Sequence, residues 1–266
     1  MPNLRQSYLL KSEYFELTRR DRRVLDYLEK SEASDTIEKA FQSRQLNESI
    51  NETRLYSFLR ENLNPQKPEL LQYFDDEKSE DVVLLFIDIT SFSRRIKGWS
   101  NLAIKKYLDE YYKVIIPMIY KYGGEIEKLM GDGVICLFGR PFLDLDSPKN
   151  VYRAEECAQA AIKHFHGTDK NVKVAIHKGV VTYYKVPGEH YGEYTMVGQP
   201  ITDLYRLESV STPNAINFYA DSAYDHLGWR QSIFKEDEVI GKNIPIQNLQ
   251  GVDYTERRYI KFPGFI

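Results

Sequence analysis

The spacing of apolar and polar residues divides the chain into two parts that meet near residue 80. Residues 1–78 are rich in charge, and their apolar residues recur at helical spacing, as in Ile50, Leu55, Phe58 and Leu59. This pattern predicts a helical N-terminal extension, which ends near the polar run DDEKSED. We expect the extension to support dimerisation or regulation, and the sequence identifies no stimulus that it would sense.

Residues 79–228 show the mixed pattern of an α/β domain. Apolar runs and alternating runs predict strands at 82–87, 125–130, 134–138, 172–177, 180–186, 194–197 and 215–220. Amphipathic stretches with capping residues predict helices at 100–122, 147–166 and 199–210. The order βαββαβ with additions predicts an α+β fold whose sheet is covered on one face by helices. Residues 229–266 are expected to form a C-terminal extension that packs on this domain.

Composition and charge exclude several classes of function. The chain has 36 Lys+Arg and 39 Asp+Glu, a net charge of −3, which argues against general nucleic-acid binding. Its 2 cysteines, Cys136 and Cys157, provide neither a disulfide framework nor zinc-site spacing. The longest apolar runs are far shorter than the roughly 20 residues of a membrane span, and the N-terminus lacks the apolar core of a signal peptide. We therefore expect a cytoplasmic protein with no nucleic-acid partner and no membrane partner.

Two aspartates are the first candidates for a functional site. Asp88 ends an apolar strand, and Asp132 occupies the tip of a predicted hairpin between Gly131 and Gly133. Because a helix leads away from the first strand and returns before the hairpin, the two strands can lie side by side and form an oxygen-ligand site for Mg²⁺ or Mn²⁺. Taken alone, Asp132 could be a simple turn residue, because Gly-Asp-Gly favours turns. A carboxylate flanked by LLFI and ITSF needs a partner, so the pair favours a metal site.

The sequence around these aspartates resembles the class III nucleotidyl cyclases. Four blocks carry the likeness, in order and with near-matching spacing: FIDITSF (86–92), YGGEIEKLMGDGVICLFGRP (122–141), AIHKG (175–179) and YTMVGQPITDLYRLES (194–209). The likeness covers about residues 80–225. It implies the class III cyclase domain, a ferredoxin-like or palm-type βαββαβ fold. It also implies the reaction, in which the ribose 3′-hydroxyl attacks the α-phosphate, pyrophosphate leaves and a 3′,5′-cyclic nucleotide forms.

The resemblance assigns roles to individual residues. Asp88 and Asp132 match the family's metal-binding aspartates, the Ile89 carbonyl is expected to touch a metal, and two divalent ions, Mn²⁺ or Mg²⁺, are implied. Phe92, at the end of the first block, is placed among the substrate-binding residues. Arg206 matches the family's transition-state arginine, because a planar cation with several donors suits charge that develops on phosphate oxygens.

Two alternatives to functional roles stay open in these blocks. Arg206 would otherwise be an exposed helix arginine paired with Glu208 or Asp203. His177, at the end of a strand, is expected to be a structural histidine rather than a base.

Family members are head-to-tail dimers. Their sites combine metal aspartates from one chain with the base-reading residues and the arginine of the other. Because this chain carries both sets, the resemblance implies a homodimer with two equivalent sites for a nucleoside triphosphate.

Departures from the family pattern fall on the base-reading positions. Lys128 matches the lysine that contacts the base in adenylyl cyclases, but the aspartate that reads the adenine amino group is replaced by Thr195. A hydroxyl donates or accepts, whereas a carboxylate only accepts, so the clearest reason to select ATP is lost. The guanylyl pattern is absent too. Uracil offers a C4 carbonyl to Lys128 and an N3–H to Thr195, so we expect UTP to be favoured and CTP to come next.

Two further departures concern the ribose and the phosphates. Thr202 replaces the asparagine that orients the ribose, and its side chain is shorter. Asp203 or a water is expected to make the contact with the ribose instead. Tyr183 and Tyr184 stand where family members have small residues near the phosphates. They are expected either to narrow the pocket in favour of a pyrimidine or to face the other chain or the solvent.

Together these features resemble the pyrimidine cyclases of the bacterial Pycsar anti-phage systems. That resemblance implies cyclic UMP or cyclic CMP as an alarm signal and a separate effector protein that senses it. One alternative is an adenylyl or guanylyl cyclase. Another is a diguanylate cyclase, suggested by GGEI at 123–126 but opposed by the different hairpin tip. A third is a catalytically dead nucleotide-binding homologue, which Thr202 permits and the retained Arg206 opposes.

Overall fold

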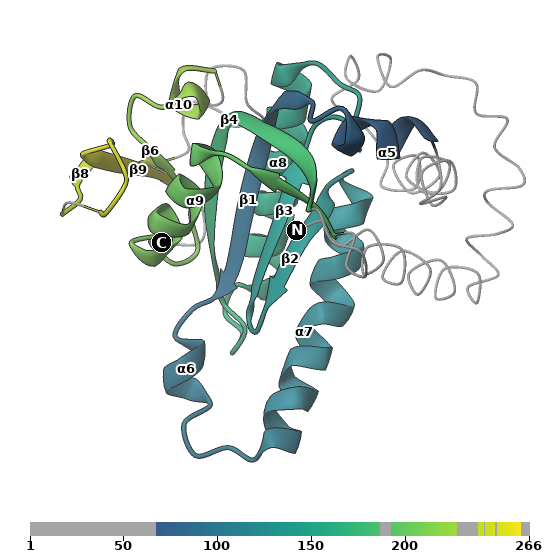
Figure 1. The fold of residues 1–266 in the computed structure, drawn as a ribbon. Helices are drawn as coiled ribbons and strands as arrows, with labels where there is room; N and C mark the ends of the chain where they lie inside the picture. Colours follow the sequence, from purple (N-terminus) through teal and green to yellow (C-terminus); the bar gives the residue numbers. More distant parts are fainter. Residues whose placement is uncertain (1–67, 187–192, 228–238, 242, 248, 262–266) are drawn as a thin grey trace, which may run out of the picture.

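The computed structural model describes residues 68–186, 193–227, 239–241, 243–247 and 249–261 (Figure 1). The predicted helical segments before residue 68 lie outside these ranges. In the part of the chain that is described, no helix has the length and apolar character needed to cross a bilayer.

A single mixed sheet organises the described residues. Its strands are β1 Ser79–Ile89, β2 Glu125–Met130, β3 Gly133–Phe138, β4 Val172–Val186, β5 Glu193–Val197, β6 Ile216–Tyr219, β7 Val239–Ile240, β8 Ile244–Pro245 and β9 Glu256–Lys261. The helices are α5 Pro68–Asp75, α6 Phe92–Arg95, α7 Asn101–Lys121, α8 Ser147–Phe165, α9 Gln199–Ser209 and α10 Ala223–Leu227. The strand order is β2-β3-β1-β4-β6-β9-β7, with β5 paired to β4 and β8 to β9. The predicted α+β class and element order are thus confirmed.

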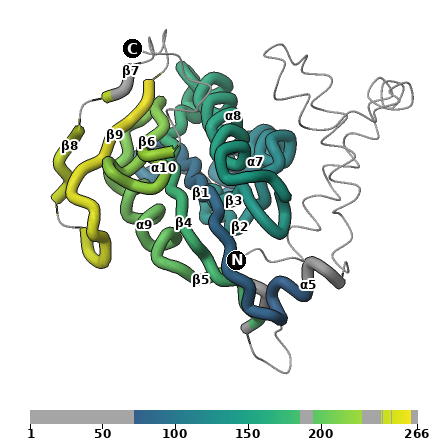
Figure 2. Tube along the Cα trace, turned by 90° about the horizontal axis from the view of Figure 1, so that it is seen from above, coloured from purple at the N-terminus to yellow at the C-terminus, as the bar shows by residue number. Residues whose placement is uncertain are grey.

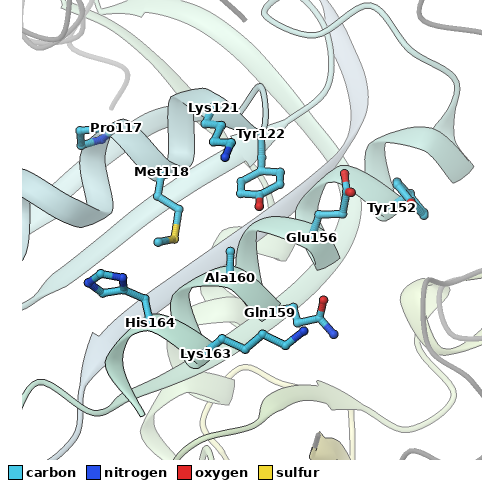
Figure 3. Close-up of a pocket in the computed structure, with 10 residues that line it drawn as sticks. All are labelled: Pro117, Met118, Lys121, Tyr122, Tyr152, Glu156, Gln159, Ala160, Lys163 and His164. Carbon is cyan, nitrogen blue, oxygen red and sulfur yellow. The ribbon is translucent and has the colours of Figure 1, made fainter. Parts of the chain in front are cut away.

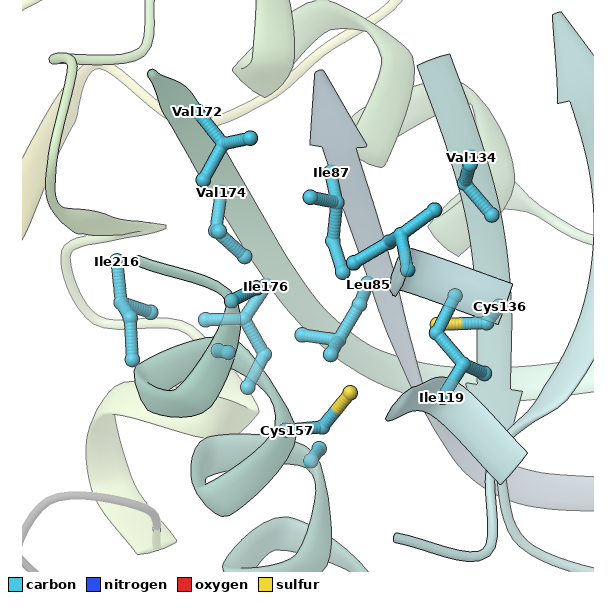
Figure 4. Close-up of a cluster of buried hydrophobic side chains, with 14 of the residues drawn as sticks. Leu85, Ile87, Ile119, Val134, Cys136, Cys157, Val172, Val174, Ile176 and Ile216 are labelled. Carbon is cyan, nitrogen blue, oxygen red and sulfur yellow. The ribbon is translucent and has the colours of Figure 1, made fainter. Parts of the chain in front are cut away.

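Helices cover both faces of the sheet, not one as predicted (Figure 2). Strand β1 explains this difference, because its apolar run presents side chains to both sides. Val83, Leu85 and Ile87 pack in the cluster that α7 and α8 cover (Figure 4). Leu84 and Phe86 pack in the cluster that α9 covers. Cys136 and Cys157 are free thiols in the first cluster, so neither forms a disulfide.

Strand β4 is one continuous strand of 15 residues, although the sequence predicted two. The expected break fell at Lys178-Gly179, but Lys178 is buried and its ammonium group is paired with the Asp81 carboxylate. Gly179 continues the pairing with β1, opposite Val82. A side chain at residue 179 would place its Cβ 2.5 Å from Cγ of Pro200, in the first turn of α9. Gly179 therefore marks the close approach of a helix rather than a turn.

Capping residues fix the helix starts where the sequence predicted them. The Ser100 hydroxyl accepts a hydrogen bond from the Ala103 amide at the start of α7, at 3.3 Å. The Asp146 carboxylate accepts one from the Lys149 amide at the start of α8, at 3.0 Å. Both interactions satisfy backbone donors that a helix leaves free at its N-terminus.

Replacement of Gly179 by Ala tests the packing of α9 on β4. We expect Gly179→Ala to lower the free energy of unfolding by about 1–3 kcal/mol, because the new methyl group overlaps the Pro200 ring. Lys185→Ala, at an exposed position of the same strand, should change it by less than about 0.5 kcal/mol. Urea titration followed by circular dichroism measures both, and equal effects would contradict the close approach.

Candidate active site

Asp88 and Asp132 lie together at one end of the sheet. Asp88 is near the end of β1, and Asp132 is in the turn between β2 and β3, the strand next to β1. Their carboxyl groups lie close enough that each affects the pKa of the other. Burial, the Asp132 carboxylate and the Glu208 carboxylate together raise the pKa of Asp88 to about 8. Burial also raises the pKa of Asp132. The predicted pair is therefore brought together at a site that strongly disfavours two bare negative charges.

The hairpin is shaped so that the two carboxyl groups can meet. A Cβ at Gly133 would lie 2.5 Å from Cε2 of Phe86 and 3.4 Å from Oδ1 of Asp88, so only glycine fits there. Gly131 has a φ of 62°, in the left-handed region. The Tyr112 hydroxyl on α7 donates a hydrogen bond to the Gly131 carbonyl and so holds the turn against the helix. Both glycines of the GDG sequence therefore serve the position of Asp132.

A lysine and a glutamate complete the charge pattern around Asp88. Lys173 is the cross-strand neighbour of Asp88 on β4. Its Nζ lies 3.5 Å from Oδ2 of Asp88 and 2.5 Å from Oε1 of Glu208 on α9. Burial acts to lower the pKa of Lys173, but Glu208 and Asp88 outweigh it and raise the pKa. Sequence reasoning missed Lys173, because its role depends on the register of β1 against β4, which no short motif encodes.

The donor set fits hard divalent cations. Carboxylate and carbonyl oxygens are the ligands that Mg²⁺ and Mn²⁺ prefer, and Asp88, Asp132 and the Ile89 carbonyl would supply them. Among the described residues, no cluster of three or more His, Cys, Asp and Glu side chains forms a full cage. Water and substrate phosphates would have to complete the coordination, which is the usual situation for Mg²⁺.

Phe92 is placed differently from the other predicted substrate residues. Its side chain is buried and packs against Tyr107, with ring centroids 6.0 Å apart. The preceding residue, Ser91, has a φ of 59°. Any contact between Phe92 and a substrate must therefore come through its backbone.

Lys128 is exposed on the face of the sheet that carries Asp88. A bulge at Glu127 lets Ile126 turn into the core that α7 and α8 cover, while Lys128 faces the side of the sheet where α9 packs. Lys128 pairs with Ile135 on β3, which pairs with Phe86 on β1. Strands lie about 4.8 Å apart, so Lys128 is displaced from β1 by roughly 10 Å within the same chain.

Helix α9 presents Thr202 and Arg206 on its exposed face, one turn apart. The opposite face buries Leu204 and Leu207 against the sheet. The alternative partners predicted for Arg206 are engaged elsewhere, because Glu208 pairs with Lys173 while Asp203 is buried beneath the helix.

The buried Asp203 carboxylate corrects one prediction. It accepts a hydrogen bond from Gln199 at 2.9 Å and lies 3.5 Å from Nε2 of His177. Asp203 therefore points away from the face that carries Thr202, and it cannot replace the ribose-orienting asparagine. His177 is buried among Tyr219 and Tyr254, as expected of a structural histidine.

Thr195 lies far from Asp88 along the sheet. It pairs with Tyr184 near the end of β4, whereas Asp88 pairs with Lys173 near its start. At about 3.3 Å per residue, roughly 35 Å of strand separates these two positions. On the same face as Thr195, the side chains of Val180 and Val197 are 58% and 48% exposed.

The predicted role of Tyr183 at the phosphates is wrong. Its side chain is buried, packs edge-on against Phe74 and donates a hydrogen bond to the Arg140 carbonyl at 2.7 Å. It faces neither the metal site, another chain nor solvent. The reason is the parity of β4, which sends odd-numbered residues such as Val181 and Tyr183 into the core beneath α5 and α9.

A separate groove of about 750 Å³ lies between α7 and α8 (Figure 3). Met118 and Tyr122 line it from α7, and Glu156 and Lys163 line it from α8. These helices cover the face of the sheet opposite the side chain of Asp88. The groove therefore takes no part in the site built around the aspartates.

Comparison with known proteins identifies the family. The profile of the Adenylate and Guanylate cyclase catalytic domain family matches residues 74–244, more than half of the chain. The chain belongs to this family. The α+β domain is therefore a nucleotidyl cyclase domain of class III, and cyclases of this class use divalent metal ions.

Solved structures agree on the fold. The adenylyl cyclase CyaB from P. aeruginosa superposes with a TM-score of 0.57 at 21% identity, covering 69% of this chain and 94% of that one. The guanylyl cyclase Cya2 superposes with a TM-score of 0.56 at 21% identity, covering 71% of this chain and 95% of that one.

Relatives in sequence are longer proteins. Adenylate cyclase 1 of Rhizobium meliloti is 20% identical over 151 residues, which are 54% of this chain and 23% of that protein. An uncharacterized protein of Mycobacterium tuberculosis is 23% identical over 183 residues, 66% of this chain and 34% of that protein. The chain thus aligns with about a third or less of these relatives.

The shifted pKa of Asp88 predicts a pH dependence of stability without metal. In the folded chain this carboxyl stays protonated up to about pH 8, whereas its ordinary pKa is 3.8. The folded state then binds more protons than the unfolded state, so stability should fall as pH rises from about 4 to 8. Asp88→Asn removes this loss, and we expect the metal-free variant to melt a few degrees above wild type at pH 8.

Thermal melts at pH 4 and pH 8 in EDTA measure the effect. Asp109→Asn removes an exposed carboxylate that is paired with Lys105, and it serves as the control. A variant Asp88→Asn that melts below wild type at pH 8 would contradict the assigned protonation.

Proposed function

We propose that this chain is a metal-dependent pyrimidine cyclase, which converts UTP to 3′,5′-cyclic UMP and pyrophosphate and accepts CTP next. The observation that carries the reaction is the close pair of buried carboxyl groups on Asp88 and Asp132, whose electrostatic cost would be offset by bound cations. Thr195 in place of an aspartate supports the choice of a pyrimidine.

One group of residues would bind the metal ions and the phosphates. Asp88, Asp132 and the Ile89 carbonyl would hold two divalent ions, Mn²⁺ or Mg²⁺, which activate the ribose 3′-hydroxyl and neutralise the phosphates when bound. Lys173, already beside Asp88, offers its ammonium group to triphosphate oxygens. Arg206 offers several donors to the charge that develops at the α-phosphate.

Base recognition falls to two polar side chains. Lys128 donates to the C4 carbonyl of uracil, and the Thr195 hydroxyl accepts from N3–H. The shorter Thr202 side chain replaces an asparagine at the ribose, with water filling the remaining distance.

Two copies of the chain are needed for one complete site in this proposal. This follows from the resemblance, because family members combine the metal aspartates of one chain with the base-reading residues and the arginine of the other. A head-to-tail homodimer would place Asp88 and Asp132 of one copy against Lys128 and Arg206 of the other. The exposed Val180 and Val197 beside Thr195 suit burial against a second copy.

The wider role follows from the resemblance to Pycsar cyclases. We propose a cytoplasmic enzyme whose cyclic pyrimidine nucleotide signals phage infection to a separate effector protein. Residues 1–78 would act as a helical dimerisation or regulatory extension, residues 79–228 as the catalytic domain, and residues 229–266 as an extension packed on it. Strand β9 supports the last assignment, because it pairs with β6 at the edge of the sheet.

A purine cyclase is the second candidate. It is favoured by the similar solved structures, which are an adenylyl and a guanylyl cyclase. The retained Asp88, Asp132 and Arg206 speak against a dead nucleotide-binding homologue, because binding alone requires no group aimed at a transition state.

Product analysis decides between these candidates. Purified protein is incubated with Mn²⁺ and each of UTP, CTP, GTP and ATP, and products are identified by mass spectrometry. We expect cyclic UMP as the main product and cyclic CMP in smaller amount. Cyclic AMP or cyclic GMP as the main product would overturn the pyrimidine assignment. Bound nucleotide without turnover would indicate a dead homologue.

Mixing two inactive variants tests the shared site. Asp88→Asn removes a metal ligand, and Arg206→Ala removes the phosphate-facing cation, so each homodimer should be inactive. Random mixing makes half of the dimers mixed, and each mixed dimer has one intact site of two, so about a quarter of wild-type activity should return. Recovery requires that subunits exchange, which a tag-based pull-down confirms. Exchange without recovered activity would show that each site lies within one chain.

A further inference from the structure

Tyr205 occupies the face of the sheet that carries Lys128. It comes from α9, directly before Arg206. Its ring meets Phe86 on β1 edge-on, with centroids 5.6 Å apart and an interplanar angle of 84°. Its hydroxyl reaches Met130 on β2, with 3.5 Å between the oxygen and the sulfur. The ring thus spans from the central strand β1 to the outer strand β2.

The sheet register places this ring beside the base-reading lysine. Lys128 and Met130 are two residues apart on β2, so their side chains point to the same face. Lys128 shares a cross-strand row with Ile135 and Phe86. Tyr205 contacts Met130 next to Lys128 along the strand and Phe86 two strands across from it. Tyr205 and Lys128 therefore share one face of the sheet, where the tyrosine side chain can border a base that bonds to Lys128.

The Tyr205 hydroxyl has a weak partner in this arrangement. A thioether sulfur is a poor hydrogen-bond acceptor, and the side chain is only half-buried. A carbonyl oxygen of a ligand would be a better acceptor than Met130. The ring, in contrast, is held by its edge-on contact with Phe86 on the face of the sheet that carries Lys128.

We propose that Tyr205 determines base specificity by leaving room for one ring beside Lys128. The fused second ring of a purine overlaps the tyrosine side chain, whereas a single pyrimidine ring fits between it and the lysine. The hydroxyl donates to the C2 carbonyl, which uracil and cytosine share. This role rests on the proposed function, because it takes Lys128 as the base-reading residue. It explains selection of pyrimidines as a class and leaves the choice between UTP and CTP to Thr195.

Two substitutions separate the ring from the hydroxyl. Tyr205→Ala opens the space, and it should raise the ratio of kcat/KM for ATP or GTP over UTP by about tenfold or more. Tyr205→Phe keeps the ring and loses one hydrogen bond, so the ratio should stay near that of wild type while kcat/KM falls for UTP and CTP alike. Each ratio compares two substrates on one preparation, so loss of folded protein does not affect it.

Tyr73→Ala provides the matched control. Tyr73 is also half-buried and meets another aromatic ring edge-on, that of Tyr183, but it lies away from Lys128. Its substitution should leave the purine-to-pyrimidine ratio unchanged.

The outcomes distinguish the two proposals. A wild-type enzyme that prefers ATP or GTP overturns the pyrimidine assignment and the role of Tyr205 with it. A wild-type preference for pyrimidines that survives in Tyr205→Ala overturns the role of Tyr205 alone. A ratio that shifts equally in Tyr73→Ala also overturns it, because the effect would then be a general loosening of the fold.

Discussion

Two carboxyl groups that repel each other when ionised are held side by side at one end of the sheet. Asp88 and Asp132 come from neighbouring strands, and their approach requires glycine at residue 133 and a tyrosine that ties the turn to α7. Burial and the neighbouring carboxylates hold the pKa of Asp88 near 8, so the metal-free fold is strained electrostatically. Lys173 only partly offsets this strain, because it is shared with Glu208, whose carboxylate adds to the negative charge around Asp88. A bound cation would relieve this strain, so metal binding at these carboxyl groups would also stabilise the fold.

Helix α9 contacts the charged groups around Asp88 and also carries residues that we assign to substrate binding. Its buried face packs on β1 and β4 and places Glu208 beside Lys173, while its exposed face carries Thr202 and Arg206. Tyr205 lies between these two faces and reaches the strand of Lys128. Helix α9 thus borders the end of the sheet that carries Asp88 and Asp132, and it also presents residues that we assign to the site of a second copy. A change in the packing of α9, as at Gly179, should therefore affect both groups of residues.

The sequence predicted the elements and the approach of Asp88 to Asp132 well, because short motifs encode them. Strand ends, helix caps and the glycine-flanked Asp132 are local features, and the four cyclase blocks fixed their order. Features that depend on contacts between distant parts of the chain could not be predicted from the sequence. The charge partners of Asp88 depend on strand register, and the burial of Asp203 and Tyr183 depends on which face of a strand or helix meets the core. The sequence predicted two strands where β4 is one, because Gly179, which leaves room for the Pro200 ring, has the same pattern in sequence as a glycine in a turn.

A crystal of the protein with Mn²⁺ and a non-cyclisable UTP analogue, examined by anomalous scattering, would locate the metal ions and the base together. We expect manganese against Asp88 and Asp132 of one copy and the uracil ring against Lys128 and Thr195 of the other. Manganese at another place, or a nucleotide held by residues of one copy alone, would contradict this expectation.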